Sequence, residues 1–277
     1  MSAPINSNTR EFAQAILNVL ERGAAASIVT VVRAPQNVGR KLLIEESGAV
    51  FGTLSKQFLD DLARGFSDDF LSSQMEASLH KVSRLGTVEA GWEDAELLFE
   101  RIEPEPKVVI CGAGHVGSAL AQVAAIARYR TSLIDDRAAF LTSERFPNKD
   151  IELIVALEWE RAVADAVGRG RGVSICVVTR GHNEDERCLR AAVACSPDYA
   201  GLIGSRRRTN IVLQRLLASG VDTAVVSKIH APIGLDIGAV TPEEVAIAIF
   251  SEIVAVRRGG KSGSLSAWRR EPTIKSG

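Results

Sequence analysis

A strand-like run that turns through a glycine loop into an apolar helix constrains this chain more than any other feature. Residues 108–111 read Val-Val-Ile-Cys, and residues 112–117 read Gly-Ala-Gly-His-Val-Gly before an apolar stretch. The first turn of a helix has unpaired backbone N–H groups and partial positive charge, so this arrangement can hold an anion. In this pattern, Gly112 allows the tight turn, Gly114 lets a phosphate approach the backbone, and Gly117 lets the helix pack closely on the strand.

A second strand and a pair of acids follow where a nucleotide site needs them. Residues 131–134 are strand-like and lead into Asp135 and Asp136, about 20 residues beyond the loop. Either carboxylate could bind a ribose hydroxyl. Alternatively, the two acids could cap a helix or lie in a solvated turn. Arg137 could instead face a phosphate. Strand, loop, helix, strand and acid together predict a Rossmann-like domain.

The length of the chain predicts more than one domain. Its 277 residues exceed the usual size of a single domain. Residues 103–106, Glu-Pro-Glu-Pro, are typical of a stiff, solvated connector. We therefore expect a small α+β domain over residues 1–103, a Rossmann-like domain over residues 104–260 and a flexible tail over residues 261–277.

Strand-like and helix-like segments alternate beyond the connector, which predicts a doubly wound parallel sheet in an α/β domain. Strands are predicted at 108–111, 131–135, 152–155, 173–178, 199–203 and 225–229, and helices at 115–127, 159–167, 184–194 and 206–218. Residues 241–244, Thr-Pro-Glu-Glu, combine a cap, a proline and a capping-box glutamate, and predict the start of a last helix.

The region before the connector mixes both element types. Its patterns predict helices at 9–22 and 58–79 and strands at 26–32, 41–45, 49–54 and 96–102.

Charge and cysteine content exclude several classes of protein. The formal net charge is −1, so we expect no binding to nucleic acid or to a membrane surface. No apolar run is long enough to span a bilayer, and the N-terminus lacks a signal-peptide core, so we expect a cytoplasmic protein. The four cysteines show no Cys-x-x-Cys spacing and are expected to be reduced.

Ligands of open parallel sheets bind beyond the carboxyl ends of the strands, so the residues that follow each strand are the candidate site. These residues are Gly112, Gly114, His115, Gly117, Asp135, Asp136, His182, Asp185, Gly204, Ser205, Arg206, Arg207, His230, Pro232 and Gly234.

Three arginines, Arg206, Arg207 and Arg208, open a predicted helix at its positive end, where cations are disfavoured. A bound anion would remove that conflict, whereas long side chains that extend into water would also relieve it. His115, His182 and Asp185 match no zinc spacing, and we expect them to bond a ligand or a neighbouring loop rather than a metal.

No catalytic signature stands out. The sequence has no Gly-x-Ser-x-Gly elbow, and no cysteine has an evident activating neighbour. The region before the connector offers no clear acid–base pair for hydride transfer. The chain therefore favours a binding role over catalysis.

Several motifs resemble the xanthine dehydrogenase accessory proteins, the XdhC/CoxI family. The matching stretches lie at residues 109–117, 134–137, 146–147, 180–185, 199–208, 230–238 and 241–246. The histidine within the glycine loop, the Gly-Ser-Arg-Arg turn and the Pro-Ile-Gly-Leu loop together are quite specific.

The resemblance implies a role in building molybdenum hydroxylases of the xanthine or carbon monoxide dehydrogenase type. Members of the family bind the molybdenum cofactor, as molybdopterin or its dinucleotide form, hold it while a terminal sulfur is installed, and pass it to the apo-hydroxylase. The resemblance thus implies an apo molybdenum hydroxylase as partner, and a cysteine desulfurase as a further one. A homodimer is the default oligomer.

The first domain departs from the family pattern. Gln36 stands where the family has an arginine, and Phe58 stands where a glycine run leads into a cysteine. A thiolate contact from that position is lost, and Lys56 could substitute only electrostatically.

Three hypotheses remain open from the sequence. The chain is a cofactor carrier that works mainly through its second domain, an NAD(P)-dependent oxidoreductase that uses the Rossmann domain, or a docking protein without a ligand.

Overall fold

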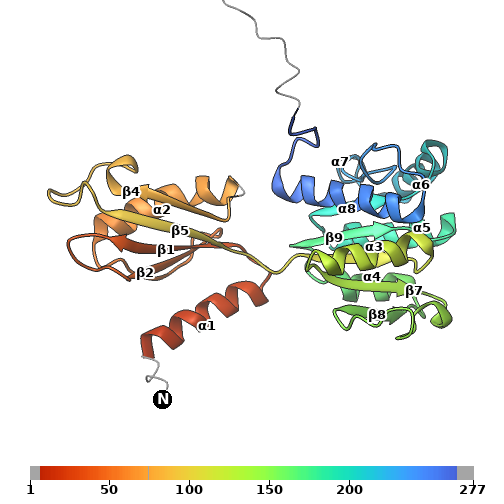
Figure 1. The fold of residues 1–277 in the computed structure, drawn as a ribbon, viewed down its shortest axis with the longest axis horizontal. Coiled ribbons are helices and arrows are strands. Elements are labelled where there is room, and N and C mark those ends of the chain that lie inside the picture. The colour runs from red at the N-terminus through yellow and green to blue at the C-terminus, as the bar shows by residue number, and fades with distance from the viewer. Residues whose placement is uncertain (1–6, 74, 267–277) are drawn as a thin grey trace, which may run out of the picture. The chain divides into compact units, whose positions relative to one another are not determined.

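The computed structural model describes residues 7–73 and 75–266. The chain divides into two compact units, Met1–Glu105 and Pro106–Gly277, which we describe separately (Figure 1). The division falls within the Glu-Pro-Glu-Pro connector. Of the tail predicted over residues 261–277, residues 267–277 lie outside the described part.

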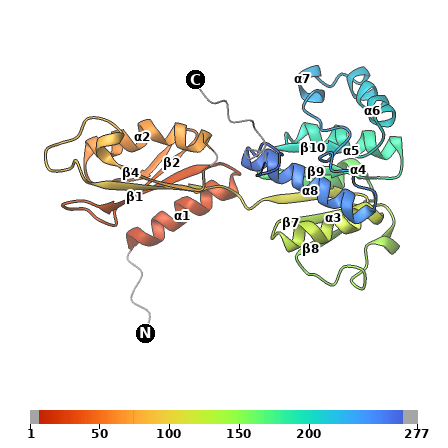
Figure 2. The same cartoon turned by 45° about the horizontal axis from the view of Figure 1, so that its top comes forward.

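The first unit is a five-stranded antiparallel sheet with a helix on each face (Figure 2). Alternating side chains of the central strand explain the two faces: Val29 packs under α2, and Ile28 packs against α1. The sheet order is β3-β2-β1-β5-β4. The elements are α1 (Ser7–Glu21), β1 (Ala26–Arg33), β2 (Lys41–Glu45), β3 (Val50–Gly52), α2 (Gln57–Ser72), β4 (Ala77–Lys81), η1 (Val82–Arg84) and β5 (Glu96–Ile102).

The single helix predicted over residues 58–79 is wrong at its C-terminal end, after Ser72. Helix α2 ends at Ser72, and residues 77–81 form the edge strand β4, in which His80 pairs with Leu97 of β5. Apolar residues at helical spacing continue only to Phe70, and the alternating exposure of β4 belongs to a strand.

The second unit has a five-stranded parallel sheet of order β10-β9-β6-β7-β8. Strand β6 therefore lies between β7 and β9, and the chain reverses its direction of winding there. This is the switch point at which such sheets bind ligands. The strands are β6 (Lys107–Cys111), β7 (Arg130–Asp135), β8 (Ile151–Val155), β9 (Val173–Val177) and β10 (Tyr199–Leu202).

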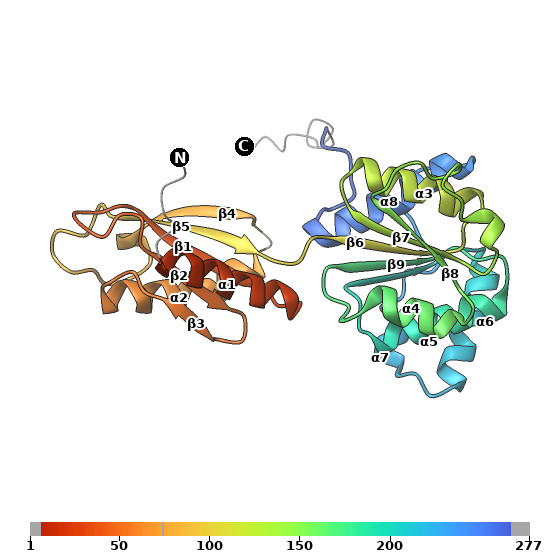
Figure 3. The same cartoon turned by 90° about the horizontal axis from the view of Figure 1, so that it is seen from below.

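Helices cover both faces of this sheet, as Figure 3 shows. Val108 and Ile110 pack against α3 and α8, while Val109 and Cys111 pack against α4, α5 and α6. The helices are α3 (His115–Ile126), η2 (Ala138–Phe140), α4 (Trp159–Val167), α5 (His182–Ala194), α6 (Arg206–Ala218), α7 (Thr223–Val226) and α8 (Pro242–Arg258). The predicted fold class, a Rossmann-like doubly wound sheet preceded by a small α+β unit, is confirmed.

The strand predicted over residues 225–229 does not form. Asp222 caps the short helix α7 by accepting a hydrogen bond from the Ala224 N–H at 2.6 Å. The following segment touches the sheet at one bridge, where the His230 N–H donates to the Ala200 carbonyl at 2.9 Å. An apolar run of this length suits a strand or a short helix equally, and the aspartate cap decides for the helix.

The capping box predicted at residue 241 is present, and it gives a test of the fold. Thr241 Oγ1 accepts from the Glu244 N–H at 3.2 Å, and the Glu244 carboxylate accepts from the Thr241 N–H at 2.9 Å. We expect Thr241→Ala to lower the free energy of unfolding by about 1 kcal/mol, because a donor at the start of α8 loses its acceptor. Thr241→Ser keeps the acceptor and should unfold like the wild type in denaturant titrations. Equal losses in the two variants would contradict the capping role.

Candidate functional site

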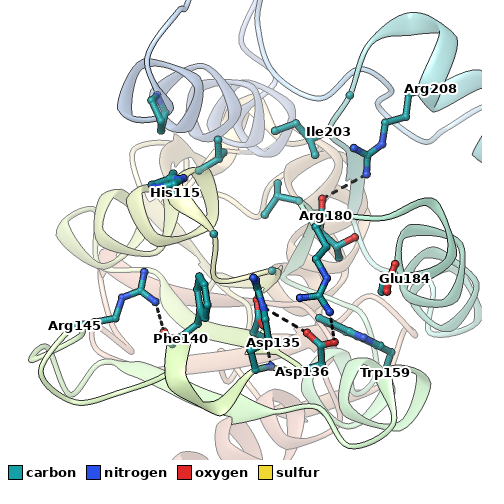
Figure 4. A pocket seen from close by; sticks show the side chains of 18 residues that line it. His115, Asp135, Asp136, Phe140, Arg145, Trp159, Arg180, Glu184, Ile203 and Arg208 are labelled. Carbon is teal, nitrogen blue, oxygen red and sulfur yellow. Dashed lines mark hydrogen bonds and ion pairs between the residues drawn. The ribbon is translucent and has the colours of Figure 1, made fainter.

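A cleft of about 570 Å³ opens at the carboxyl edge of the parallel sheet, where β6, β7 and β9 end (Figure 4). Its lining brings together segments that are far apart in the sequence. The lining residues are Gly112, Gly114, His115, Val116, Asp135, Asp136, Arg137, Phe140, Arg145, Trp159, Val178, Thr179, Arg180, Glu184, Ile203, Gly204, Arg208 and Pro242. The glycine loop, Asp135 and Asp136 thus share one cavity.

The three glycines of the loop differ in what surrounds them. Gly112 has φ +113°, and a Cβ there would lie 2.6 Å from the Val178 carbonyl oxygen. A Cβ on Gly117 would collide with the Gly112 carbonyl, so helix α3 can pack this closely on β6 only with glycine. A Cβ on Gly114 would meet nothing within 4 Å. The turn and packing roles predicted for Gly112 and Gly117 are confirmed, and Gly114 leaves open space before α3.

Asp135 is a structural clamp. Its side chain is about 2% exposed, and its carboxylate accepts from the Ala113 N–H at 2.7 Å and from the Arg137 N–H at 2.9 Å. The Arg137 guanidinium donates twice more to it, at 2.8 and 2.9 Å. Burial opposes ionisation, but these hydrogen bonds outweigh it and lower the pKa of Asp135 to about 2. The carboxylate therefore fixes the glycine loop to the end of β7.

The neighbouring acid, Asp136, is accessible. Its side chain is 32% exposed, and its Oδ2 accepts from an Arg180 guanidinium nitrogen at 2.8 Å. Figure 4 shows the Arg180 side chain reaching to Asp136, beside Asp135. Of the two acids that the sequence left undecided, Asp136 is the one free to meet a ligand.

Asp185 supports the cleft from behind. It is fully buried and accepts from Thr179 Oγ1 and from an Arg208 guanidinium nitrogen, each at 2.6 Å. Burial raises the pKa of Asp185, although these two donors act in the opposite direction. The side chain holds Arg208 at the wall of the cleft, so Asp185 is a positioning residue.

Among the helices whose N-termini reach this edge, α3 is best suited to an anion. Its N-cap is Gly114, with no side-chain hydrogen bond and no acid in the first turn. Helix α5 has Glu184 and Asp185 in its first turn, and the start of α6 is capped by Ser205. Acids and caps occupy the positive ends of α5 and α6, whereas the first turn of α3 has no acid of its own to offset its partial charge.

Arg206 and Arg207 do not join this cleft. They line a separate hollow with Thr209, Asn210 and Ala231, and the arginine that faces the glycine loop is Arg208. The sequence placed Gly114, Arg206 and Arg207 in one candidate site, and this is corrected, because the two arginines lie in another hollow. An α-helix turns by about 100° per residue, so Arg206 and Arg208 point in directions about 200° apart.

His182, Ser205, His230, Pro232 and Gly234 also lie outside the lining of the cleft. His230 Nδ1 lies 3.3 Å from the Glu252 carboxylate, and its ring stacks on Tyr199 at 4.5 Å between centroids. The same carboxylate accepts from the Gly234 N–H at 2.8 Å and from the Tyr199 hydroxyl at 2.5 Å. His230 therefore braces the loop after β10.

Arg145, Phe140 and Trp159 line the cleft and were missed by the sequence prediction. The Arg145 guanidinium donates to the Phe140 carbonyl at 2.9 Å and to Ser118 Oγ, in the first turn of α3, at 3.2 Å. The Arg137 guanidinium stacks on the Phe140 ring at 3.8 Å. Phe140 and Arg145 come from the long connection between β7 and β8, and neither lies in a stretch that the sequence singled out.

Phe58 and Lys56, two first-unit residues singled out by the sequence, both contact Trp92. The Phe58 ring packs edge-on against Trp92, with centroids 5.6 Å apart. Lys56 is ion-paired with Glu89 at 3.1 Å and lies over the same Trp92 ring. Phe58 is therefore a packing residue in this structure.

In residues 7–73 and 75–266, no group of three or more His, Cys, Asp or Glu side chains is arranged to hold a metal ion. Within the same ranges, no helix has the length and apolar character needed to cross a bilayer.

The model of the XdhC Rossmann domain matches residues 108–253, which is more than half of the chain. This protein belongs to the XdhC family. The match includes all five strands of the parallel sheet and the cleft described above.

Relatives of known sequence agree with this assignment. The chain is 32% identical over 166 residues to a probable xanthine dehydrogenase subunit of Bacillus subtilis (strain 168), and the match covers 60% of this chain and 47% of that protein. It is 27% identical over 244 residues to the uncharacterized protein YqeB of Escherichia coli (strain K12), and this match covers 87% of this chain and 44% of that protein. The chain thus spans less than half the length of these relatives.

A solved structure supports the fold. The crystal structure of a xanthine dehydrogenase (BH1974) from Bacillus halodurans matches with a TM-score of 0.68 and 18% identity, over 98% of this chain and 72% of that one. The likeness therefore extends through both units.

The clamp role of Asp135 can be tested through the pH dependence of stability. We expect Asp135→Asn to lower the free energy of unfolding at pH 7 by about 2–3 kcal/mol, since a pKa near 2 compares with about 3.9 in unfolded chains. The stabilisation is present above about pH 4 and is lost as the pH falls towards 2, because the native carboxylate then becomes protonated. Urea titrations across this range measure the difference.

Asp136→Asn is the matched control for this experiment. The Asp136–Arg180 ion pair is partly exposed, so Asp136→Asn should lower the free energy of unfolding by less than about 1 kcal/mol. Equal losses in both variants, or a loss for Asp135→Asn that does not shrink in acid, would refute the clamp.

Proposed function

We propose that this protein is an accessory factor that binds the molybdenum cofactor through the cleft of its second unit, assists its sulfuration, and delivers it to a molybdenum hydroxylase of the xanthine or carbon monoxide dehydrogenase type. Membership of the XdhC family supports the accessory role. The observation that carries the proposal is the uncapped first turn of α3, open at Gly114, beside a cleft lined by four arginines.

The residues of the cleft fit the phosphate end of this cofactor. A Cβ on Gly114 would meet nothing within 4 Å, and Arg145 reaches the first turn of α3 through Ser118. A guanidinium beside a helix N-terminus is a strong combination for a phosphate. When bound, the cofactor supplies the molybdenum centre, while this chain contributes binding and orientation.

The charged groups of the cleft support carrying rather than catalysis. Asp135 is bonded to Arg137, Asp136 to Arg180, and Asp185 holds Arg208. A general base needs an accessible group within hydrogen-bond reach of its substrate, and these acids are engaged with arginines. The alternative, an NAD(P)-dependent oxidoreductase, would have to bind the ribose through Asp136, because Asp135 is buried and bonded to Arg137.

Retention of the cofactor tests the proposal. We expect protein purified from a host that makes the cofactor to release a fluorescent pterin after oxidation. Gly114→Ala should reduce the pterin at least tenfold, because the new methyl group occupies the space before α3, where a Cβ meets no protein atom within 4 Å. Fluorescence per mole of protein is the measurement.

Gly65→Ala is the control, because Gly65 also has open space around it and lies on α2 in the first unit. It should retain the pterin of the wild type. Repeated absence of pterin from the wild type, with an established carrier as positive control, would overturn the proposal. Reduction of NAD or NADP by a purified substrate would establish the oxidoreductase instead.

A further inference from the structure

A cavity of about 540 Å³ lies in the first unit, between α1 and one face of the antiparallel sheet. We call it the α1 cavity. Its walls come from α1, from β1, β2 and β3, and from the turn that joins β1 to β2, so it shares no residue with the cleft of the second unit. Figure 3 shows α1 lying along this face of the sheet. The volume is within the range of roughly 300–1,000 Å³ that is typical of small-molecule sites.

One wall of the α1 cavity is apolar. Phe12 and Ile16 line it from α1, and Ile28 lines it from β1. The Phe12 ring packs against Phe51 of β3, with centroids 6.0 Å apart, and this contact holds the ring over the sheet. An apolar part of a ligand can therefore leave water by lying against these side chains.

The opposite character appears at Arg40 and Lys41, two exposed cations that also line the cavity. The Lys41 Nζ donates to Thr30 Oγ1 at 2.8 Å, which leaves two of its three N–H donors for a ligand. Within residues 7–73 and 75–266, neither cation forms an ion pair, and no carboxylate lines the cavity. The α1 cavity thus presents positive charge that the described part of the chain does not neutralise.

The arrangement of β2 keeps the nearest acid on this face away from the cavity. Lys41, Leu43 and Glu45 share the face that α1 covers, because alternate residues of a strand point the same way. Glu45 is paired with Arg22 at 2.6 Å. Four residues of a strand span about 13 Å, so this carboxylate lies too far along the strand to pair with Lys41.

We propose that the α1 cavity binds a small organic acid that has an apolar body and one carboxylate. The apolar body lies along Phe12, Ile16 and Ile28, and the carboxylate accepts from Lys41 and Arg40. This inference goes beyond the proposed function, because it gives the first unit a ligand of its own and uses no residue of the cleft.

Both parts of the ligand are required by the chemistry of the cavity. A carboxylate without an apolar body meets only exposed cations, and such pairs are weak in water. An apolar molecule with a neutral head leaves both cations without a partner. Each methylene group that leaves water strengthens binding about fourfold, so affinity should rise with the length of the apolar body.

Calorimetric titration of the whole chain at pH 7 tests the site. The probes are decanoate, octanoate, octan-1-ol and acetate. We expect decanoate to bind about tenfold more tightly than octanoate, because two more methylene groups leave water. Octanoate should bind at least fivefold more tightly than octan-1-ol, and acetate should give no measurable binding.

Variants at Lys41 test the contribution of charge. Lys41→Met removes the ammonium group and keeps an unbranched side chain, so it should weaken octanoate binding at least fivefold and leave octan-1-ol binding unchanged. Lys41→Arg should bind octanoate like the wild type. Lys81→Met is the matched control, because it removes a cation from β4, at the far edge of the same sheet, where Lys81 pairs with Asp94 at 2.8 Å. It should leave the affinity for every probe unchanged.

Filling the cavity is the second test. Ala13 lines the cavity from α1, so Ala13→Leu should weaken decanoate binding at least tenfold. Gln14→Leu places the same side chain on α1 at a residue that does not line the cavity, and it should bind decanoate like the wild type. Leucine is a strong helix former, so both variants should keep α1.

Each part of the inference can fail separately. Equal binding of octanoate and octan-1-ol, or unchanged octanoate binding by Lys41→Met, would refute the role of the cations. No binding of decanoate by the wild type, or equal losses in Ala13→Leu and Gln14→Leu, would overturn the site. Retention of pterin is measured independently and tests only the proposed function.

Discussion

The candidate site depends on one buried carboxylate. Asp135, at the end of β7, accepts hydrogen bonds from the backbone of the glycine loop and from Arg137. A charge in this place is tolerable only because every neighbouring donor is directed at it. The bonds tie the loop after β6 to the loop after β7, so the two walls of the cleft are held in register before any ligand arrives.

Pairing of charges gives the cleft its character. Four arginines line it, yet three of them are bonded to aspartates at or behind its wall. A paired arginine can bind an anion only if its ion pair with the aspartate opens. The three arginine–aspartate pairs differ in how deeply they are buried. Asp135 and Asp185 are buried and hold their arginines, whereas Asp136 is partly exposed. Burial thus separates the fixed framework from the pair that a ligand can exchange.

Membership of the XdhC family rests on the second unit, because the family model matches residues 108–253. In the first unit, Phe58 packs edge-on against Trp92, and Lys56 lies over the same ring. This aromatic pair contributes to the apolar core between α2 and the sheet.

The sequence by itself determined the Rossmann-like sheet, the glycine loop, the capping box of α8 and the location of the site at the carboxyl edge, because these follow from local periodicity and from backbone constraints at glycine and proline. It also placed Asp135 and Asp136 at this edge without deciding between them. The roles of the two acids, the choice of Arg208 over Arg206 and the contribution of Arg145 were decided only by tertiary structure. These three outcomes depend on contacts between segments that are far apart in the sequence, and on how deeply packing buries each side chain. Local sequence determines neither the contacts nor the burial.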